Sequence, residues 1–164
     1  MSETLREAWP DLAGLRPPHG PMSIPREATV LAFDFGTRRI GVAIGNTIVR
    51  VARPLATIDA QASDARFAAV GALIAEWQPD QIVVGIPVHA NGAEHAMTAR
   101  ARRFARQLAG RFRLPVAEAD ERHTTQDAQA SLEQGGGGRA SRARRDEIAA
   151  QIILQAWFDQ RHAG

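Results

Sequence analysis

The apolar pattern of the chain changes once, near residue 60, and this change narrows the folds that it can adopt. Before that point, alternating or short apolar runs predict strands over 29–35, 39–45 and about 51–58. The turn GTRR between the first two is short enough for a hairpin, and Pro54 makes the third an edge or broken strand. We therefore expect these strands to form an antiparallel meander.

After residue 60 the apolar spacing becomes helical. Helices are expected over 63–78, with Ser63 as its N-cap, and over 93–112, 124–133 and 145–160. Short apolar runs over 81–85 and 115–120 are typical of buried parallel strands. A meander followed by alternating helices and strands favours an α/β fold: a mixed five-stranded sheet with helices on both faces.

Length and composition indicate one core. A chain of 164 residues, 45% of them hydrophobic, has room for one domain, which we place at 28–162. Residues 1–27 are proline-rich and aperiodic, so we expect a loosely ordered N-terminal extension. The chain lacks cysteine and any apolar run near the roughly 20 residues that span a bilayer, so a cytoplasmic protein is expected.

The basic residues exclude several enzyme classes. All 20 are arginine, and without lysine the chain cannot form a P-loop, a protein-kinase site or a Schiff base. The formal net charge is only +2, but arginines concentrate over 100–113 and 135–145. Such clusters are equally typical of phosphate-binding patches and of solvated helix faces.

One carboxylate, Asp34, stands inside the apolar stretch VLAFDFGTRR. Alternation puts Asp34 on the face of Val30 and Ala32, which a central strand buries. A buried charge needs a partner or a function. The structural alternative is that Asp34 caps the turn at Gly36 and Thr37.

Two acidic pairs follow further along the chain. Asp120 and Glu121 end a predicted strand and point to opposite faces, so one of them can reach a shared site; the alternative is a surface pair with Arg122. Asp146 lies on the apolar side of the last helix, whereas Glu147 points away; the alternative is dipole stabilisation of a helix start. Carboxylates converging from two strand ends and a helix would suit Mg²⁺ or Mn²⁺.

Five segments together resemble one family. LAFDFGTRRIGVAIG, QPDQIVVGIP, TARARRFARQL, DERHTTQDA and DEIAAQIIL are similar to the YqgF or RuvX family of proposed pre-16S rRNA nucleases, also described as Holliday-junction-resolvase-like. The match covers about residues 28–160 in order. The resemblance implies an RNase H-like fold and a cytoplasmic divalent-metal nuclease that acts on structured nucleic acid, with a role at the 5′ end of pre-16S rRNA.

The resemblance also implies which carboxylates bind the metal and take part in catalysis. Asp34, Glu121 and Asp146 match the catalytic and metal-binding acids of the family, with Asp120 as an alternative ligand. The implied mechanism is phosphodiester hydrolysis with two ions of Mg²⁺ or Mn²⁺, about 3.5 to 4 Å apart and bridged by Asp34.

Arginines near these acids are candidates for nucleic-acid binding. The candidates are Arg39, Arg122, Arg142, Arg144 and Arg145. The last three are expected on a glycine-hinged loop that either closes over the nucleic-acid backbone or is a disordered basic loop, and Arg122 is equally a salt-bridge partner.

Other functions remain open at this stage. The same acids would suit a four-way DNA junction resolvase, in endonuclease or exonuclease mode. A ribosome-assembly factor that binds RNA through Arg102, Arg103 and Arg106 without catalysis is a different class. The motif DFGT also resembles the phosphate loop of actin-like kinases and ATPases, but 164 residues leave no room for their second lobe. Oligomeric state is not indicated.

Overall fold

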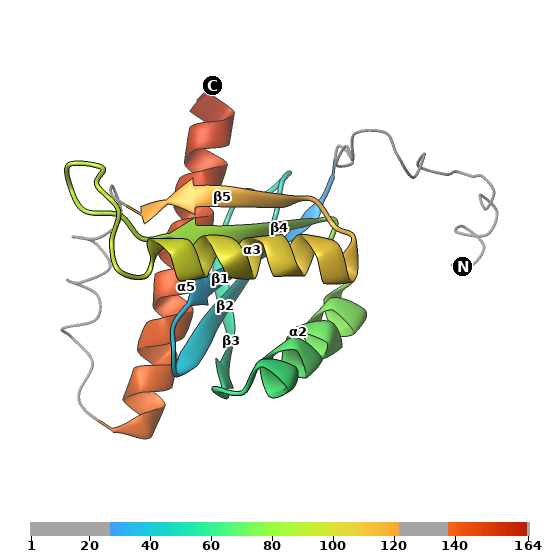
Figure 1. Cartoon of the computed structure of the whole chain (residues 1–164). Coiled ribbons are helices and arrows are strands. Elements are labelled where there is room, and N and C mark those ends of the chain that lie inside the picture. Colours follow the sequence, from blue (N-terminus) through green and yellow to red (C-terminus); the bar gives the residue numbers. More distant parts are fainter. Residues whose placement is uncertain (1–26, 122–137, 164) are drawn as a thin grey trace.

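The protein is described here by a computed structural model that covers residues 27–121 and 138–163 (Figure 1). In these ranges one five-stranded sheet has the order β3-β2-β1-β4-β5. The elements are β1 (Thr29–Phe35), β2 (Arg39–Asn46), β3 (Arg53–Asp59), α2 (Ser63–Trp77), β4 (Gln81–Ile86), α3 (Thr98–Phe112), β5 (Val116–Asp120) and α5 (Arg139–Ala163).

The strand pairing confirms the predicted mixed sheet. β1 pairs antiparallel with β2 from Thr29–Asn46 to Phe35–Ile40, and β2 pairs antiparallel with β3. β4 is parallel to β1 on its other side, and β5 is parallel to β4. β1 is therefore the central strand, and its C-terminal end is flanked by two neighbours.

Helices cover both faces of the sheet, as predicted. α2 and α3 lie on one face and α5 crosses the other (Figure 1). The α2 and α3 face is built from large side chains such as Leu31, Phe33 and Phe104. The α5 face carries smaller strand residues, including Ala32 and Ala43. Small residues let a helix approach the strand backbone closely, so α5 lies near the carboxylate of β1.

One predicted helix cap and one predicted helix start were wrong. α2 has Ala62 at its N-cap position and makes no side-chain cap hydrogen bond, so Ser63 is its first residue and not its cap. α3 begins at Thr98, not at residue 93. The preceding residues form a bridge between Val88 and Glu94, and Thr98 Oγ1 donates to the Pro87 carbonyl at 2.5 Å. Residues 93–97, which periodicity alone assigned to this helix, therefore belong to the segment before it.

α5 begins at Arg139, six residues before the predicted start at 145. Gly138, with φ of 101°, precedes it, and its carbonyl accepts a hydrogen bond from Arg142 N at 3.0 Å. Arg142, Arg144 and Arg145 therefore lie on a helix, and their predicted position on a glycine-hinged loop was wrong.

Some predictions fall outside the described residues. The helix over 124–133 lies there entirely, and the N-terminal extension lies there except for residue 27. In the described part, no helix is both long and apolar enough to span a bilayer. The domain limits of 28–162 stay a prediction.

Candidate functional site

Asp34 occupies the C-terminal end of the central strand, between two glycines. It pairs with Gly41 of β2, and Gly85 of β4 follows the last registered pair of β1 and β4, Phe33 with Val84. Asp34 is half-buried and lies on the face that α5 covers. The absence of side chains on both sides leaves room above the sheet beside this carboxylate.

Two other carboxylates use that room. A Cβ on Gly41 would overlap the backbone carbonyl of Asp146 on α5. A Cβ on Gly85 would lie 2.7 Å from Oε2 of Glu121, which directly follows β5. The structure thus brings Asp34, Glu121 and Asp146 around the end of β1, as the sequence predicted.

These acids lie close enough to one another to raise their pKa values. Burial, then the charges of Glu121 and Asp146, raise the pKa of Asp34 well above its ordinary value. Burial and the charge of Asp120 raise the pKa of Glu121 to about 7. Asp120 is therefore near enough to act on Glu121. Clustered carboxylates with these shifts mark a functional site more often than ordinary surface acids do.

The proposed turn cap at Asp34 is not formed. In the described part of the chain, neither the N–H of Gly36 nor that of Thr37 donates to the Asp34 carboxylate, and no side chain does so. The Gly36 carbonyl instead accepts from Arg66 Nη2 at 2.6 Å. A half-buried carboxylate with acidic neighbours and no donor among the described residues is a group that a cation would stabilise.

Asp146 is held by Arg39. Arg39 Nε, at the start of β2, donates to Asp146 Oδ2 at 2.5 Å, and about three quarters of each side chain is buried. Asp146 lies well inside α5, so the alternative of dipole stabilisation at a helix start does not apply. Arg39, predicted to contact nucleic acid, therefore occupies the carboxylate with which a metal ion would interact.

The donor set suits a hard cation, although it is not a closed cage. Carboxylate oxygens are the ligands that Mg²⁺ and Mn²⁺ prefer. Over residues 27–121 and 138–163, no three acidic or histidine side chains gather tightly enough to form a ready ligand group. Asp146 is also paired with Arg39, so a cation would compete with the guanidinium for that carboxylate.

The other predicted arginines differ in their placement. Arg142 and Arg144 are exposed on α5, and Arg145 is half-buried beside Asp146. The Arg145 Nε is buried and has no hydrogen-bond partner in the part of the chain that is described. Arg122 lies outside the described residues. Arg145 therefore has a buried nitrogen whose hydrogen bond is not made within the described residues.

The raised pKa values predict a pH-dependent stability of the metal-free protein. Glu121 keeps its proton up to about pH 7 when folded but loses it near 4.5 when unfolded. Between these values the folded state binds more protons, so stability falls as pH rises. Thermal unfolding in chelator should give a lower Tm at pH 8 than at pH 5.5, and Glu121→Gln should reduce this difference. A Tm that rises over this interval would contradict the assignment.

Comparison with solved structures defines the fold class. Thermus thermophilus RuvC, solved in complex with a Holliday junction substrate, superposes with a TM-score of 0.51 at 16% identity, covering 82% of this chain and 95% of that one. A second structure of the same protein gives a TM-score of 0.50, also at 16% identity, covering 82% and 96%. At such identity the likeness concerns the fold alone. The sheet order and the helices on both faces are those of the RNase H-like class.

Sequence comparison identifies the family. The family profile described as "RuvX: Holliday junction resolvase" matches residues 28–160. A protein of Dechloromonas aromatica named "Putative pre-16S rRNA nuclease" is 54% identical over 135 residues, which are 82% of this chain and 92% of that one. A protein of Chromobacterium violaceum with the same name is 54% identical over 132 residues, 79% and 96% of the two chains. The chain belongs to the RuvX family, and this membership assigns it to the nucleases.

Sequence reasoning found the acids but missed what surrounds them. Gly41 and Gly85, inside predicted strands, were not recognised as sites of close approach, although glycine in a strand is a known sign of one. The pair of Arg39 with Asp146 joins residues 107 positions apart, and no sequence pattern indicated it.

Proposed function

We propose that the protein is a divalent-metal-dependent nuclease that hydrolyses phosphodiester bonds at the 5′ end of pre-16S rRNA. The observation that carries the proposal is the Asp34 carboxylate, which lies between Glu121 and Asp146 and has no hydrogen-bond donor among the described residues. The names of the relatives support the choice of substrate. This function agrees with a cytoplasmic location, which is part of the proposal.

The acids would hold the metal. Asp34, Glu121 and Asp146 supply the oxygen ligands for Mg²⁺ or Mn²⁺, with Asp120 next to Glu121 as a further oxygen donor. When bound, two such ions would activate water and stabilise the leaving oxygen. Asp34 is positioned by a central strand paired on both sides, so its carboxylate is rigidly placed for this role.

Arg39 would orient the substrate. Arg39 neutralises Asp146 in the metal-free protein. Once the Asp146 carboxylate binds a cation, the Arg39 guanidinium becomes available to a phosphate. Arg145 directly precedes Asp146 in α5, but its Nε is buried and so is not exposed to a substrate. Arg39 therefore places positive charge beside the carboxylates that a phosphodiester would approach.

A four-way DNA junction is the second candidate substrate, because the matching family profile is described as a Holliday junction resolvase. The same carboxylates would serve either nucleic acid. A non-catalytic RNA-binding factor is less compatible with membership of a nuclease family.

Cleavage assays distinguish these functions. We expect the purified protein to cut a 5′-extended small-subunit rRNA precursor with Mg²⁺ or Mn²⁺ and to leave it intact with chelator. Mapping the product ends would assign endonuclease or exonuclease mode. Cleavage of a four-way junction but not of the precursor would favour the second candidate. Metal-independent binding without cleavage of either substrate would contradict a nuclease.

A further inference from the structure

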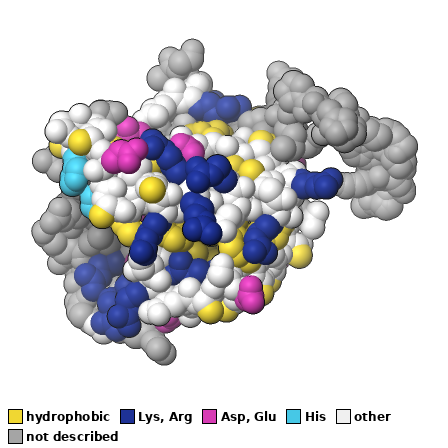
Figure 2. Space-filling view, viewed as in Figure 1, with side chains coloured by type: hydrophobic (Ala, Val, Ile, Leu, Met, Phe, Trp, Pro, Cys, Tyr) yellow, Lys and Arg dark blue, Asp and Glu magenta, His cyan; other side chains and the backbone are white. Residues whose placement is uncertain are grey.

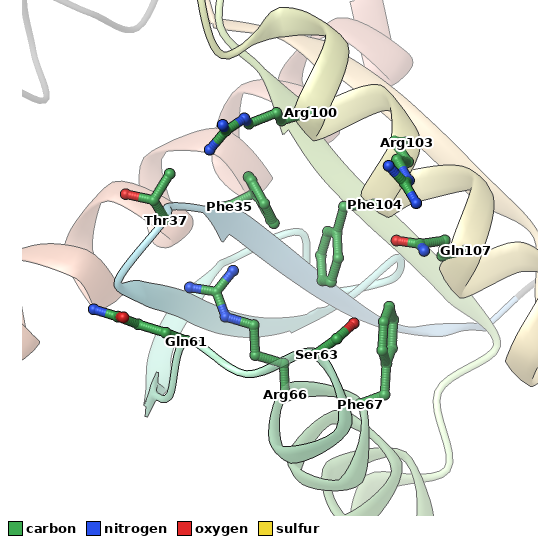
Figure 3. A pocket seen from close by; sticks show the side chains of 10 residues that line it. All are labelled: Phe35, Thr37, Gln61, Ser63, Arg66, Phe67, Arg100, Arg103, Phe104 and Gln107. Atoms are coloured by element: carbon green, nitrogen blue, oxygen red, sulfur yellow. The ribbon is translucent and has the colours of Figure 1, made fainter.

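A cavity of about 470 Å³ lies on the sheet face opposite the carboxylates. It opens between α2 and α3, beside the C-terminal end of β1 (Figure 3). Its charged lining consists of Arg66, Arg100 and Arg103, and its aromatic lining of Phe35, Phe67 and Phe104. No acidic residue of the described part lines it. We call this cavity the arginine pocket.

Arg66 supplies a buried positive charge to the pocket. Its side chain extends from α2 toward Phe35 (Figure 3), and the residue is only 6% exposed. Nε donates to the Ala60 carbonyl at 2.5 Å and Nη2 to the Gly36 carbonyl at 2.6 Å, whereas Nη1 makes no hydrogen bond in the described part. Burial lowers the pKa of Arg66, and no carboxylate of the described residues forms an ion pair with it. A buried guanidinium without an acidic partner favours an anion.

α3 adds two more arginines. Arg100 and Arg103 are one turn apart, and Figure 3 shows Arg100 reaching toward Thr37 and Phe35. Neither forms an ion pair with a described residue. Arg102 between them differs, because its guanidinium nitrogens lie 3.1 Å from a Glu94 oxygen and 3.6 Å from a Glu118 oxygen.

The surface over this face is rich in arginine. Arginine side chains gather around α3 with apolar surface between them (Figure 2). The charges of Arg100 and Arg103 are therefore available to a ligand in the pocket, whereas that of Arg102 is partly neutralised.

An aromatic face lies beside these charges. Phe35 is half-buried, and its ring centre is 5.0 Å from that of Phe104. The Arg66 guanidinium lies 5.2 Å from the centre of the Phe35 ring. Guanidinium groups bind phosphate, and an aromatic ring stacks on a base of any sequence. The volume is within the range of about 300 to 1,000 Å³ that is usual for small-ligand sites.

We propose that the arginine pocket binds one nucleotide, with its phosphate at Arg66, Arg100 and Arg103 and its base against Phe35. The pocket begins where the carboxylate site ends, because Phe35 follows Asp34 in β1 and faces the other side of the sheet. The ligand is a nucleoside phosphate, either free or as one unit of a single strand. This binding does not depend on cleavage at Asp34, so it can be tested separately.

Calorimetry with the full chain in chelator tests the proposal. The probes are AMP, adenosine, inorganic phosphate and a five-nucleotide single strand. We expect AMP to bind at least about tenfold more tightly than adenosine or phosphate, because it uses both halves of the pocket. Arg100→Ala/Arg103→Ala should weaken AMP binding at least about tenfold, since both side chains are exposed and their loss should not impair folding.

Arg102→Ala/Arg106→Ala is the matched control, because it removes two arginines from the same helix without touching the pocket lining. It should change AMP affinity by less than about threefold. Phe35→Leu should weaken AMP but not phosphate. An equal loss in both arginine pairs, or AMP that binds no better than phosphate, would overturn the proposal. Displacement of AMP by the single strand would identify a strand as the ligand, and no displacement a free nucleotide; both support the pocket.

Discussion

Replacing Asp34 with asparagine should abolish metal-dependent cleavage while making the metal-free protein more stable. Asparagine keeps the shape of the side chain but removes its charge, so the central cation ligand is lost. We expect cleavage to fall at least about a hundredfold, equivalent to about 2.7 kcal/mol. Stability should move the other way, because burial and the charges of Glu121 and Asp146 oppose the ionised carboxylate.

The two effects can be measured on the same samples. A gain on the order of 1 kcal/mol would raise the Tm by about 2 to 4 °C for a chain of this size. Asp159→Asn is the matched control, because Asp159 is exposed near the end of α5 and should change neither quantity much. Undiminished cleavage by Asp34→Asn would show that the site is placed wrongly. Lost cleavage with a lower Tm would indicate a folding defect instead.

The sheet could be predicted because its strands carry a simple periodicity. β1 was predicted as 29–35, which are its observed limits, and the order of the elements followed from the change to helical spacing. Alternation also put Asp34 on the inner face, and the apolar stripe of the last helix put Asp146 toward the sheet. Each inference needs only a repeat of two or 3.6 residues.

The start of α5 could not be predicted in this way. Its first turns, RASRARR, consist of good helix formers but have no apolar stripe, so periodicity gave no signal there. The error placed three arginines on a loop and Asp146 at a helix start, and it made the dipole explanation look sufficient. Helix propensity was the better guide in this segment.

Contacts between distant elements were also beyond the sequence. The arginine pocket takes residues from β1, α2 and α3, and the periodicity of α3 showed only that Arg103 lies away from the apolar stripe. Whether an exposed arginine meets an acid, as Arg102 does, or lines a cavity depends on how neighbouring elements pack.

Replacing Gly41 with alanine should destabilise the protein and reduce cleavage together. The added Cβ would overlap the Asp146 carbonyl, which belongs to the helix backbone and cannot rotate away. We expect a loss of about 2 to 3 kcal/mol from overpacking, or a Tm lower by about 4 to 12 °C. Displacement of Asp146 by about 1 Å would reduce cleavage on the order of a hundredfold, measured where the variant is still folded.

Substitutions at two other glycines distinguish the displacement of Asp146 from a general loss of folding stability. Gly110→Ala meets no atom within 4 Å in α3, so it should be neutral or stabilise by up to about 1 kcal/mol. Gly45→Ala also faces α5, but its Cβ would lie 2.6 Å from the ring of Phe158, far along the helix from Asp146. It should lower the Tm yet retain cleavage. If Gly45→Ala and Gly41→Ala lost cleavage equally, activity would depend on the stability of α5 and not on the close approach of Asp146 to the sheet.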